Sequence, residues 1–397
     1  MSSERRIQGL GRTPASADWP ALTRAEIEAV FAAAGLGGTF DRIDWHSPRA
    51  FSAAATVRRT DGGRLFVKRH ARALRDAEAL GEEHRFLAHL HARGLAVPQA
   101  LARVEIGGEG GWTYEVQTVP PGEDRYAEAL VWTPFRSVAD AAGAGRALRR
   151  LHRAAADYDA PARRFRPLMG GCALVAAPDL VAAVEVLATA RPGLAAGLQG
   201  QGLQGQGLQG PGPQIRDWRA AFRDCLLPFH PAARAALGVG PALWTHGDWH
   251  AGNLLWSGAE VSAVLDFGLA NRATAAFDLA VAIERNIIGW LDLPGMPDAR
   301  GVCAVEIEQA EALLAGYGAP SELRRAVSAL LPLAHLDLAL SEIEYFQALT
   351  GSSADAALAY ETYLLGHARW FAQAPGRAFL DRLGRGAGAG EEETHKS

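Results

Sequence analysis

Residues 244–270 read WTHGDWHAGNLLWSGAEVSAVLDFGLA, and the interpretation of the whole chain starts from this stretch. It contains the pattern HxDxxxxN, formed by His246, Asp248 and Asn253, and a DFG triplet that begins at Asp266. Two apolar runs separated by a polar turn lie between Asn253 and Asp266, which predicts a β-hairpin. The hairpin would bring these two residues to the same end of two paired strands.

The residue types in this pattern suit phosphoryl transfer, which depends on positioning and charge neutralisation more than on covalent help. A carboxylate facing the acceptor hydroxyl can take its proton, and we expect Asp248 to be this base. Mg²⁺ on a triphosphate binds few protein oxygens, so Asn253 and Asp266 are the expected metal ligands. The alternative is a capped turn in which these side chains only satisfy backbone groups.

The segments HGDWHAGN and LDFGLA resemble the aminoglycoside phosphotransferase and choline kinase family, small-molecule relatives of the protein kinases. Gly247 stands where most protein kinases carry arginine, and no APE triplet follows Gly268, which indicates the small-molecule branch. The resemblance covers roughly residues 40–370. It implies an α+β, bilobal protein-kinase-like fold, with a mixed five-stranded sheet in the N-lobe and a mainly helical C-lobe.

The 397 residues are expected to divide into four parts. These are a loose N-terminal arm and helix (1–38), the N-lobe (39–119), the helical C-lobe with the catalytic loop (120–383) and a disordered tail (384–397). The first helix should begin at Thr23, which has capping-box spacing to Glu26, and end at Gly35. Residues 198–212 repeat LQGQG, LQGQG and LQGPG, which is too short for a solenoid and predicts a flexible surface insert.

Alternating apolar patterns predict the five N-lobe strands at 39–46, 53–60, 64–70, 100–106 and 112–119, with a helix at 72–93. By resemblance, Lys68 on the third strand would neutralise the nucleotide phosphates. Glu83 on the helix would align Lys68, with Glu78 and Glu82 as alternatives.

The resemblance also places the nucleotide. The phosphate-covering loop would be residues 47–52, which lack a GxGxxG pattern and carry Ser52. Residues 120–122, Pro-Pro-Gly, would be the hinge between the lobes. Backbone groups near Glu115 and Gln117 would hold the adenine.

Acidic side chains on the C-terminal helices would, by resemblance, wall the acceptor pocket. Asp337 and Glu344 share one side of a helix expected at 332–349, and a solvated acidic face is the alternative. Glu284 lies in an apolar stripe, so it either faces the cleft or meets a basic partner inside the protein. Asp278 is expected to cap the helix that carries Glu284 and to brace the catalytic loop.

Composition excludes several classes of function. A net charge of −4 leaves no broad basic surface for nucleic acid or anionic lipid. The N-terminus does not resemble a signal peptide, and we expect no membrane span. Three widely spaced cysteines indicate reduced thiols and a cytoplasmic setting.

We therefore expect a small-molecule kinase that transfers the γ-phosphoryl group of ATP (or GTP), with Mg²⁺, to a hydroxyl group. The acceptor could be an aminoglycoside or another amino-bearing molecule. Kinases for an amino alcohol, a sugar or homoserine, and a nucleotide-binding regulatory pseudoenzyme, are the alternatives. The sequence leaves the oligomeric state open.

Overall fold

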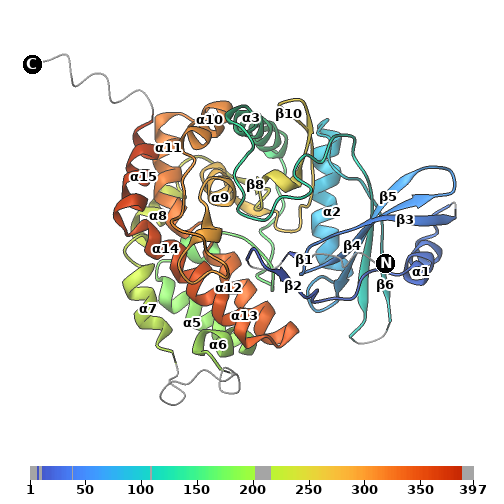
Figure 1. The fold of residues 1–397 in the computed structure, drawn as a ribbon, viewed down its shortest axis with the longest axis horizontal. Coiled ribbons are helices and arrows are strands. Elements are labelled where there is room, and N and C mark those ends of the chain that lie inside the picture. The colour runs from blue at the N-terminus through green and yellow to red at the C-terminus, as the bar shows by residue number, and fades with distance from the viewer. Residues whose placement is uncertain (1–6, 9–10, 38, 108–109, 202–215, 387–397) are drawn as a thin grey trace, which may run out of the picture.

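The computed structural model describes residues 7–8, 11–37, 39–107, 110–201 and 216–386. Figure 1 shows two lobes, with a sheet on the right and a larger body of helices on the left. Helix α2 (Ala77–Ala92) stands at the boundary between them. This arrangement confirms the expected α+β bilobal fold.

The N-lobe sheet has the strand order β3-β4-β5-β7-β6. Its strands are β3 (Phe40–His46), β4 (Ala53–Arg59), β5 (Arg64–Ala71), β6 (Ala100–Ile106) and β7 (Trp112–Thr118). All four neighbouring pairs are antiparallel, so the prediction of a mixed sheet was wrong. Short connections join β3 to β4, β4 to β5 and β6 to β7, and such hairpins make antiparallel neighbours.

One face of the sheet is covered by α1 (Arg24–Ala34), which buries Ile27 and Val30 against Val57 and Val67. The predicted ends of α1 are confirmed, with a capping box at the first turn and a left-handed Gly35 at the last. Helix α2 begins five residues later than predicted, because the Asp76 side chain accepts a hydrogen bond from the Ala79 amide and caps it there.

The N-terminal arm is not loose where the structure describes it. Arg12 donates two hydrogen bonds to the Asp292 carboxylate in the C-lobe, at 2.7 and 2.9 Å. The Tyr345 hydroxyl accepts from Trp19 Nε1 at 2.9 Å and donates to Asp18 at 2.8 Å. The arm therefore crosses from the sheet to the helical lobe, which the residues of the arm alone could not reveal.

The predicted catalytic hairpin is present as β9 (Leu254–Ser257) and β10 (Glu260–Val264), paired antiparallel. It follows β8 (Ala242–Thr245), which pairs with β11 (Asn271–Thr274). Directly after the hinge, Glu123 exchanges two backbone hydrogen bonds of 2.9 Å with Trp256 on β9. The segment that connects the lobes is thus fastened to the hairpin that carries the site.

The rest of the C-lobe is helical and surrounds an apolar core. Its α-helices are α3 (Val138–Ala155), α4 (Ala173–Ala176), α5 (Leu180–Ala190), α6 (Pro192–Gln199), α7 (Trp218–Cys225), α8 (His230–Ala236), α9 (Ala275–Asn286), α10 (Ile307–Tyr317), α11 (Ser321–Leu330), α12 (Leu336–Tyr345), α13 (Ser353–Leu358), α14 (Leu365–Phe371) and α15 (Ala374–Arg385).

The repeat-bearing insert begins later than its sequence pattern. Leu198 and Gln199 close α6, and the Leu198 side chain is fully buried, so these two residues were wrongly assigned to the insert. The Arg216 amide donates to the Gln199 carbonyl at 3.2 Å, so the two ends of the intervening segment lie next to each other. The remainder of the predicted insert, residues 202–212, lies outside the described residues, as does the predicted tail from residue 387.

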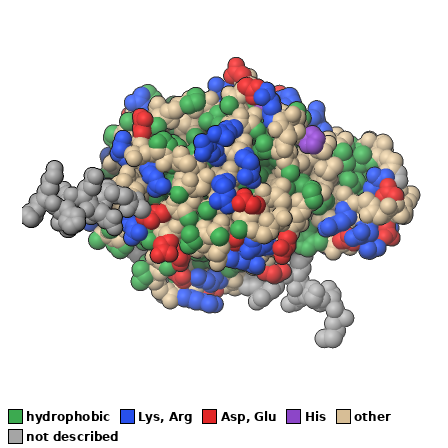
Figure 2. Space-filling model, turned by 90° about the horizontal axis from the view of Figure 1, so that it is seen from above, with side chains coloured by type: hydrophobic (Ala, Val, Ile, Leu, Met, Phe, Trp, Pro, Cys, Tyr) green, Lys and Arg blue, Asp and Glu red, His purple; other side chains and the backbone are tan. Residues whose placement is uncertain are grey.

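The helical run Ser321–Thr350 reaches the length and mean hydropathy, 1.4, of a membrane span, which the sequence analysis did not anticipate. Its most apolar window is 89% buried inside the protein, as in the core helix of a folded lobe. Figure 2 shows basic and acidic side chains together over one face of the molecule, with hydrophobic side chains scattered among them.

Candidate active site

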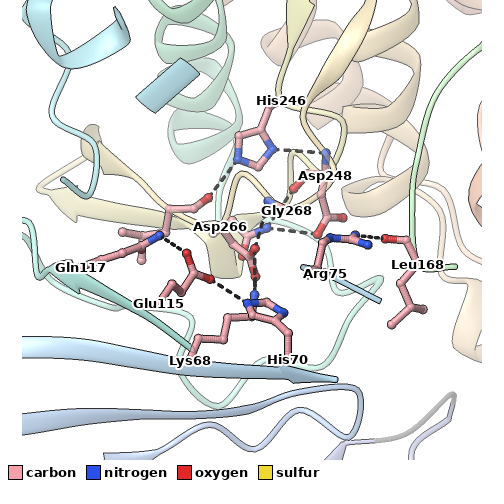
Figure 3. A network of polar contacts seen from close by, with 12 residues as sticks. Lys68, His70, Arg75, Glu115, Gln117, Leu168, His246, Asp248, Asp266 and Gly268 are labelled. Atoms are coloured by element: carbon pink, nitrogen blue, oxygen red, sulfur yellow. Dashed lines mark hydrogen bonds and ion pairs between the residues drawn. The ribbon is translucent and has the colours of Figure 1, made fainter. Parts of the chain in front are cut away.

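The loop after β8 is held by His246, which is fully buried. Its Nδ1 accepts the Asp248 amide at 3.2 Å, and its Nε2 donates to the Leu265 carbonyl at 2.9 Å (Figure 3). These two bonds assign the proton to Nε2. The imidazole thus ties the start of the loop to the strand end before Asp266, as a brace rather than a reacting group.

Asp278, in the first turn of α9, holds the same loop from beneath. Its carboxylate accepts the amides of His246 and Gly247, both at 2.9 Å, and the His152 imidazole at 2.9 Å. Burial would raise the pKa of Asp278, but these hydrogen bonds and the nearby imidazoles outweigh it, so its pKa lies below the ordinary value. The predicted brace is confirmed, whereas the cap of α9 is Thr274 and not Asp278.

Gly247 is required by this geometry. Its φ is +76°, a region that favours glycine, and a Cβ there would lie 2.4 Å from the Leu269 carbonyl oxygen. The two backbone segments of the catalytic loop and the DFG turn therefore approach each other directly at this point.

Asp248 and Asn253 face each other across the loop. The Asn253 amide nitrogen donates to the Asp248 carbonyl at 3.0 Å and to its Oδ2 at 3.2 Å. Arg285 from α9 forms an ion pair with the other oxygen, with Nε 3.2 Å from Oδ1. Because the Asn253 nitrogen is turned to Asp248, its amide oxygen is the atom left to contact a cation.

Asp266 closes the site from the DFG turn with φ at +53°, an uncommon backbone conformation for a residue other than glycine. Its Oδ1 accepts from Lys68 Nζ at 3.3 Å and from the Gly268 amide at 3.3 Å. Burial would raise the pKa of Asp266, but the Lys68 charge and the hydrogen bonds from Lys68 and the Gly268 amide together hold the pKa below its ordinary value. Burial would lower the pKa of Lys68, but the charges of Asp266, Glu115 and Glu83 together raise it.

A cavity of about 210 Å³ lies between the sheet and the helical lobe. Five predicted site residues line it: Ser52, Lys68, Asp248, Asn253 and Asp266. Among the described residues, four non-glycines have φ between +53° and +57°, and three of them (Trp132, Leu168 and Asp266) line this cavity. Strained backbone gathers at functional sites, so this cavity is the candidate site.

Glu115 and Gln117 do not line the cavity with their side chains. Glu115 lies opposite Lys68 in the sheet and is almost fully buried. Its carboxylate accepts from His70 at 2.9 Å and from Gln117 at 2.7 Å (Figure 3). It also accepts from His84 at 3.0 Å. Burial opposes ionisation, but the two imidazoles and Lys68 hold the pKa of Glu115 well below its usual range. Glu115 is therefore the centre of a buried polar cluster behind Lys68, a role that its strand position alone did not indicate.

Glu83 does not pair with Lys68 in the described structure; Lys68 pairs with Asp266 instead. Glu83 is nevertheless the buried member of the three candidate glutamates, whereas Glu78 is exposed and Glu82 pairs with Arg163. Burial and the neighbouring Glu115 raise the pKa of Glu83 to about 7.

The three acids expected at the acceptor are buried in structural contacts and are absent from the cavity wall. Asp337 accepts the Ala173 and Leu174 amides at 3.0 and 3.3 Å. Glu344 pairs with Arg191 at 2.6 Å, and Glu284 lies 3.1 Å from His367. Asp337 and Glu344 thus face neither the cleft nor the solvent. The sequence did not reveal these contacts, because the partners come from segments distant in the chain. For Glu284, the alternative of an internal basic partner fits, because Arg285 Nε lies 3.5 Å from its Oε2.

The acid of α12 that does face the cavity is Glu342, which was not among the predicted site residues. Its side chain is buried, and Oε2 has no hydrogen-bond partner in the described structure. Burial raises the pKa of Glu342 to about 8, because the opposing charge of Arg285 only partly offsets it. Arg49 and Arg285 also line the cavity and were not predicted. Little in the sequence indicated that Glu342 lines the cavity, because helix periodicity shows which residues share one side of a helix but not which side faces the cleft.

The donor set fits a hard divalent cation. Asn253 offers an amide oxygen and Asp266 a carboxylate at one edge of the cavity, and such ions bind through oxygen. No cluster of three or more His, Cys, Asp or Glu side chains suited to a metal occurs in the part of the chain that the structure describes. A cation at this edge would therefore need further oxygens from phosphate or water.

Comparisons with known proteins agree with this geometry. Residues 48–330 match the family described as "Phosphotransferase enzyme family". No curated protein sequence matches the chain.

Three solved structures are similar to this chain. An amicoumacin kinase in complex with AMP-PNP, Ca²⁺ and Ami is 14% identical with a TM-score of 0.52, and the match covers 91% of this chain and 96% of that one. An ethanolamine kinase from Plasmodium vivax is 10% identical with a TM-score of 0.49, covering 89% of each chain. A macrolide 2'-phosphotransferase from Brachybacterium faecium is 17% identical with a TM-score of 0.44, covering 86% and 97%. The first similarity confirms the kinase-like fold.

Proposed function

The chain belongs to the phosphotransferase enzyme family, and from this premise we propose that it transfers the γ-phosphoryl group of ATP, or GTP, to a hydroxyl of a small acceptor. The observation that carries the proposal is the convergence of Lys68, Asp248, Asn253 and Asp266 on one cavity. Lys68 and Asp266 are 198 residues apart in the chain, yet their side chains touch.

Each of these side chains has a task in the proposed reaction. Asp248 accepts the proton of the acceptor hydroxyl as its oxygen bonds to the γ-phosphorus. The bond between that phosphorus and the bridging oxygen breaks, and the diphosphate leaves with the electron pair. Lys68 neutralises phosphate charge, and Ser52 lies on the loop above the phosphates. Asn253 and Asp266 would hold Mg²⁺, which supplies charge neutralisation when bound.

The amicoumacin kinase with this fold contains AMP-PNP and Ca²⁺, which supports a nucleotide with a divalent cation here. Glu83 and Glu115 would act indirectly in this chain. Their buried carboxylates lie behind Lys68 and contribute to its raised pKa. The predicted adenine contacts with the backbone near Glu115 and Gln117 do not fit, because both residues pair with β5 on one side of β7 and with β6 on the other. The adenine would instead have to contact the chain beyond the end of β7.

The acceptor would occupy the part of the cavity walled by Trp132, Leu338 and Glu342. A buried carboxyl with an unpartnered oxygen favours an acceptor that offers an N–H or O–H group to it. An amino-bearing acceptor, such as an aminoglycoside or an amino alcohol, satisfies this requirement. The aromatic and aliphatic wall would cover the less polar side of the same molecule. A regulatory pseudoenzyme is the weaker alternative, because the proposed base, the proposed phosphate-binding lysine and both proposed metal ligands line one cavity.

A screen of acceptors tests the proposal. Purified protein is incubated with Mg–ATP or Mg–GTP and a panel of aminoglycosides, amino alcohols, sugars and homoserine, and phosphorylated products are detected by mass spectrometry. We expect acceptor-dependent product that disappears with Asp248→Asn. Tight nucleotide binding without product from any class of acceptor would favour the regulatory alternative.

A further inference from the structure

The loop between β3 and β4 contains an arginine where a phosphate-covering loop would usually carry glycines. Residues 47–52 read SPRAFS and include no glycine, so their backbone amides are not suited to close approach to phosphates. Ser47 and Arg49 begin this loop as a small turn, in which Ser47 Oγ accepts the Arg49 amide at 3.2 Å. The Ser47 amide in turn donates to the Ala54 carbonyl at 2.8 Å, which anchors the turn to β4.

The Arg49 side chain extends from this turn across the cavity to the catalytic loop. It lines the main cavity together with Asp248 and Asp266. It also lines a smaller adjoining pocket formed partly by Gly252 and Arg285. A Cβ built on Gly252 would lie 3.4 Å from Arg49 Nη2, so the guanidinium rests beside the turn that presents Asn253.

The charges around Arg49 define its position further. Asp248 and Asp266 are the acidic groups that act most strongly on it, with Arg285 opposing them and Asp124 adding a smaller effect. The proposed base and a proposed metal ligand thus line the same cavity as the guanidinium. In the proposed reaction the phosphoryl group moves from nucleotide to acceptor within this cavity.

We propose that Arg49 binds the γ-phosphoryl group of the nucleotide during transfer, in place of the backbone amides that a glycine-rich loop would supply. This inference rests on the proposed function. A guanidinium presents five N–H donors in a planar fork and pairs well with phosphate oxygens. Negative charge spreads over the equatorial oxygens during transfer, and a fixed cation there lowers the barrier. Lys68 is already paired with Asp266 on the DFG turn, whereas Arg49 lies beside the turn that presents Asn253, so we expect the two cations to hold different phosphates.

The test compares two nucleotides and needs no acceptor. Isothermal titration measures the affinity of Mg–ADP and of Mg–AMP-PNP for the wild type, Arg49→Ala and Arg49→Lys. We expect Arg49→Ala to weaken Mg–AMP-PNP binding about tenfold or more and to change Mg–ADP binding less than about twofold. Arg49→Lys should retain part of the affinity, since it keeps the charge but loses the fork.

Arg42→Ala is the matched control, because Arg42 is an exposed arginine on β3 that pairs with Asp41 and Asp44 away from the cavity. A melting temperature for each variant separates misfolding from lost binding. Equal weakening of both nucleotides, or unchanged AMP-PNP binding by Arg49→Ala, would overturn the inference. Failure of the wild type to bind either nucleotide would instead refute the proposed function.

Discussion

Asp266 concentrates three constraints in one residue: a left-handed backbone, an ion pair across the lobes and the proposed contact with the metal. Lys68 Nζ lies 3.3 and 3.4 Å from the two carboxylate oxygens, and each oxygen has a further lone pair that can contact a cation. A neutral side chain of the same shape would keep the turn but lose the charge.

Asp266→Asn should therefore raise the Mg²⁺ concentration needed for nucleotide binding by about tenfold or more, because hard cations prefer charged oxygen ligands. Titration of Mg²⁺ at fixed nucleotide, followed by fluorescence, measures this. Asp159→Asn is a suitable control, since Asp159 is 92% exposed and pairs only with Arg272 in the described structure. An unchanged metal requirement in Asp266→Asn would remove Asp266 from the metal site.

Glu342 makes a prediction about pH. Its pKa is about 8 in the folded protein and 4.5 ordinarily. Between these values the folded state keeps a proton that the unfolded state has released, so the stability contributed by Glu342 falls as pH rises through this window. Glu83 and Asp337, with pKa values of about 7 and 6, act in the same direction.

Glu342→Gln cannot titrate, so its melting temperature should fall less than that of the wild type between pH 5 and pH 8.5, by roughly 2 °C or more. The comparison isolates Glu342, because Glu83 and Asp337 are present in both proteins. Differential scanning fluorimetry over this range provides the measurement. Parallel pH profiles would show that the Glu342 carboxyl is already ionised in the folded protein.

At the scale of elements, helices α3 and α10 meet backbone to backbone. A Cβ on Gly145 would lie 2.1 Å from the Leu313 carbonyl oxygen, and one on Gly316 would lie 2.2 Å from that of Ala142. The same helix pair places His152 beside Tyr317 at 2.9 Å and directs its other nitrogen to Asp278. The packing of these helices thus supports the brace under the catalytic loop.

Gly145→Ala should lower the free energy of unfolding by about 1–3 kcal/mol, because the helices must separate to admit the methyl group. Chemical denaturation measures the change. Gly37→Ala is the control, since a Cβ there meets no atom within 4 Å. Equal stability of Gly145→Ala and wild type would mean that the two helices are less closely packed than the structure shows.

Elements with local signals could be predicted from the sequence, and distant partners could not. The hairpin between Asn253 and Asp266 and the Thr23 cap both follow from patterns within one short stretch of sequence. By contrast, Glu344 meets Arg191, which is 153 residues away. A pattern of acids on one helix does not show which distant residues these acids contact. The acceptor contact that we propose is therefore Glu342, and not Glu344.

At the scale of the whole molecule, the site exists only where the two lobes meet. Lys68 reaches Asp266 across the cleft, and Arg75 donates to the carbonyls of Pro167 and Leu168 in the C-lobe (Figure 3). The N-terminal arm adds a third connection through Tyr345. These contacts hold the N-lobe wall of the cavity, where we propose that the phosphates bind, against the C-lobe wall.

The central claim is that this junction performs phosphoryl transfer with Asp248 as the base. The most direct test is the turnover of wild type and Asp248→Asn on the acceptor identified by the screen, together with the affinity of each protein for Mg–nucleotide. We predict a loss of turnover of about 10²- to 10⁴-fold, with nucleotide affinity changed less than about twofold, because Asp248 faces the acceptor. Turnover by Asp248→Asn at the wild-type rate would contradict the account.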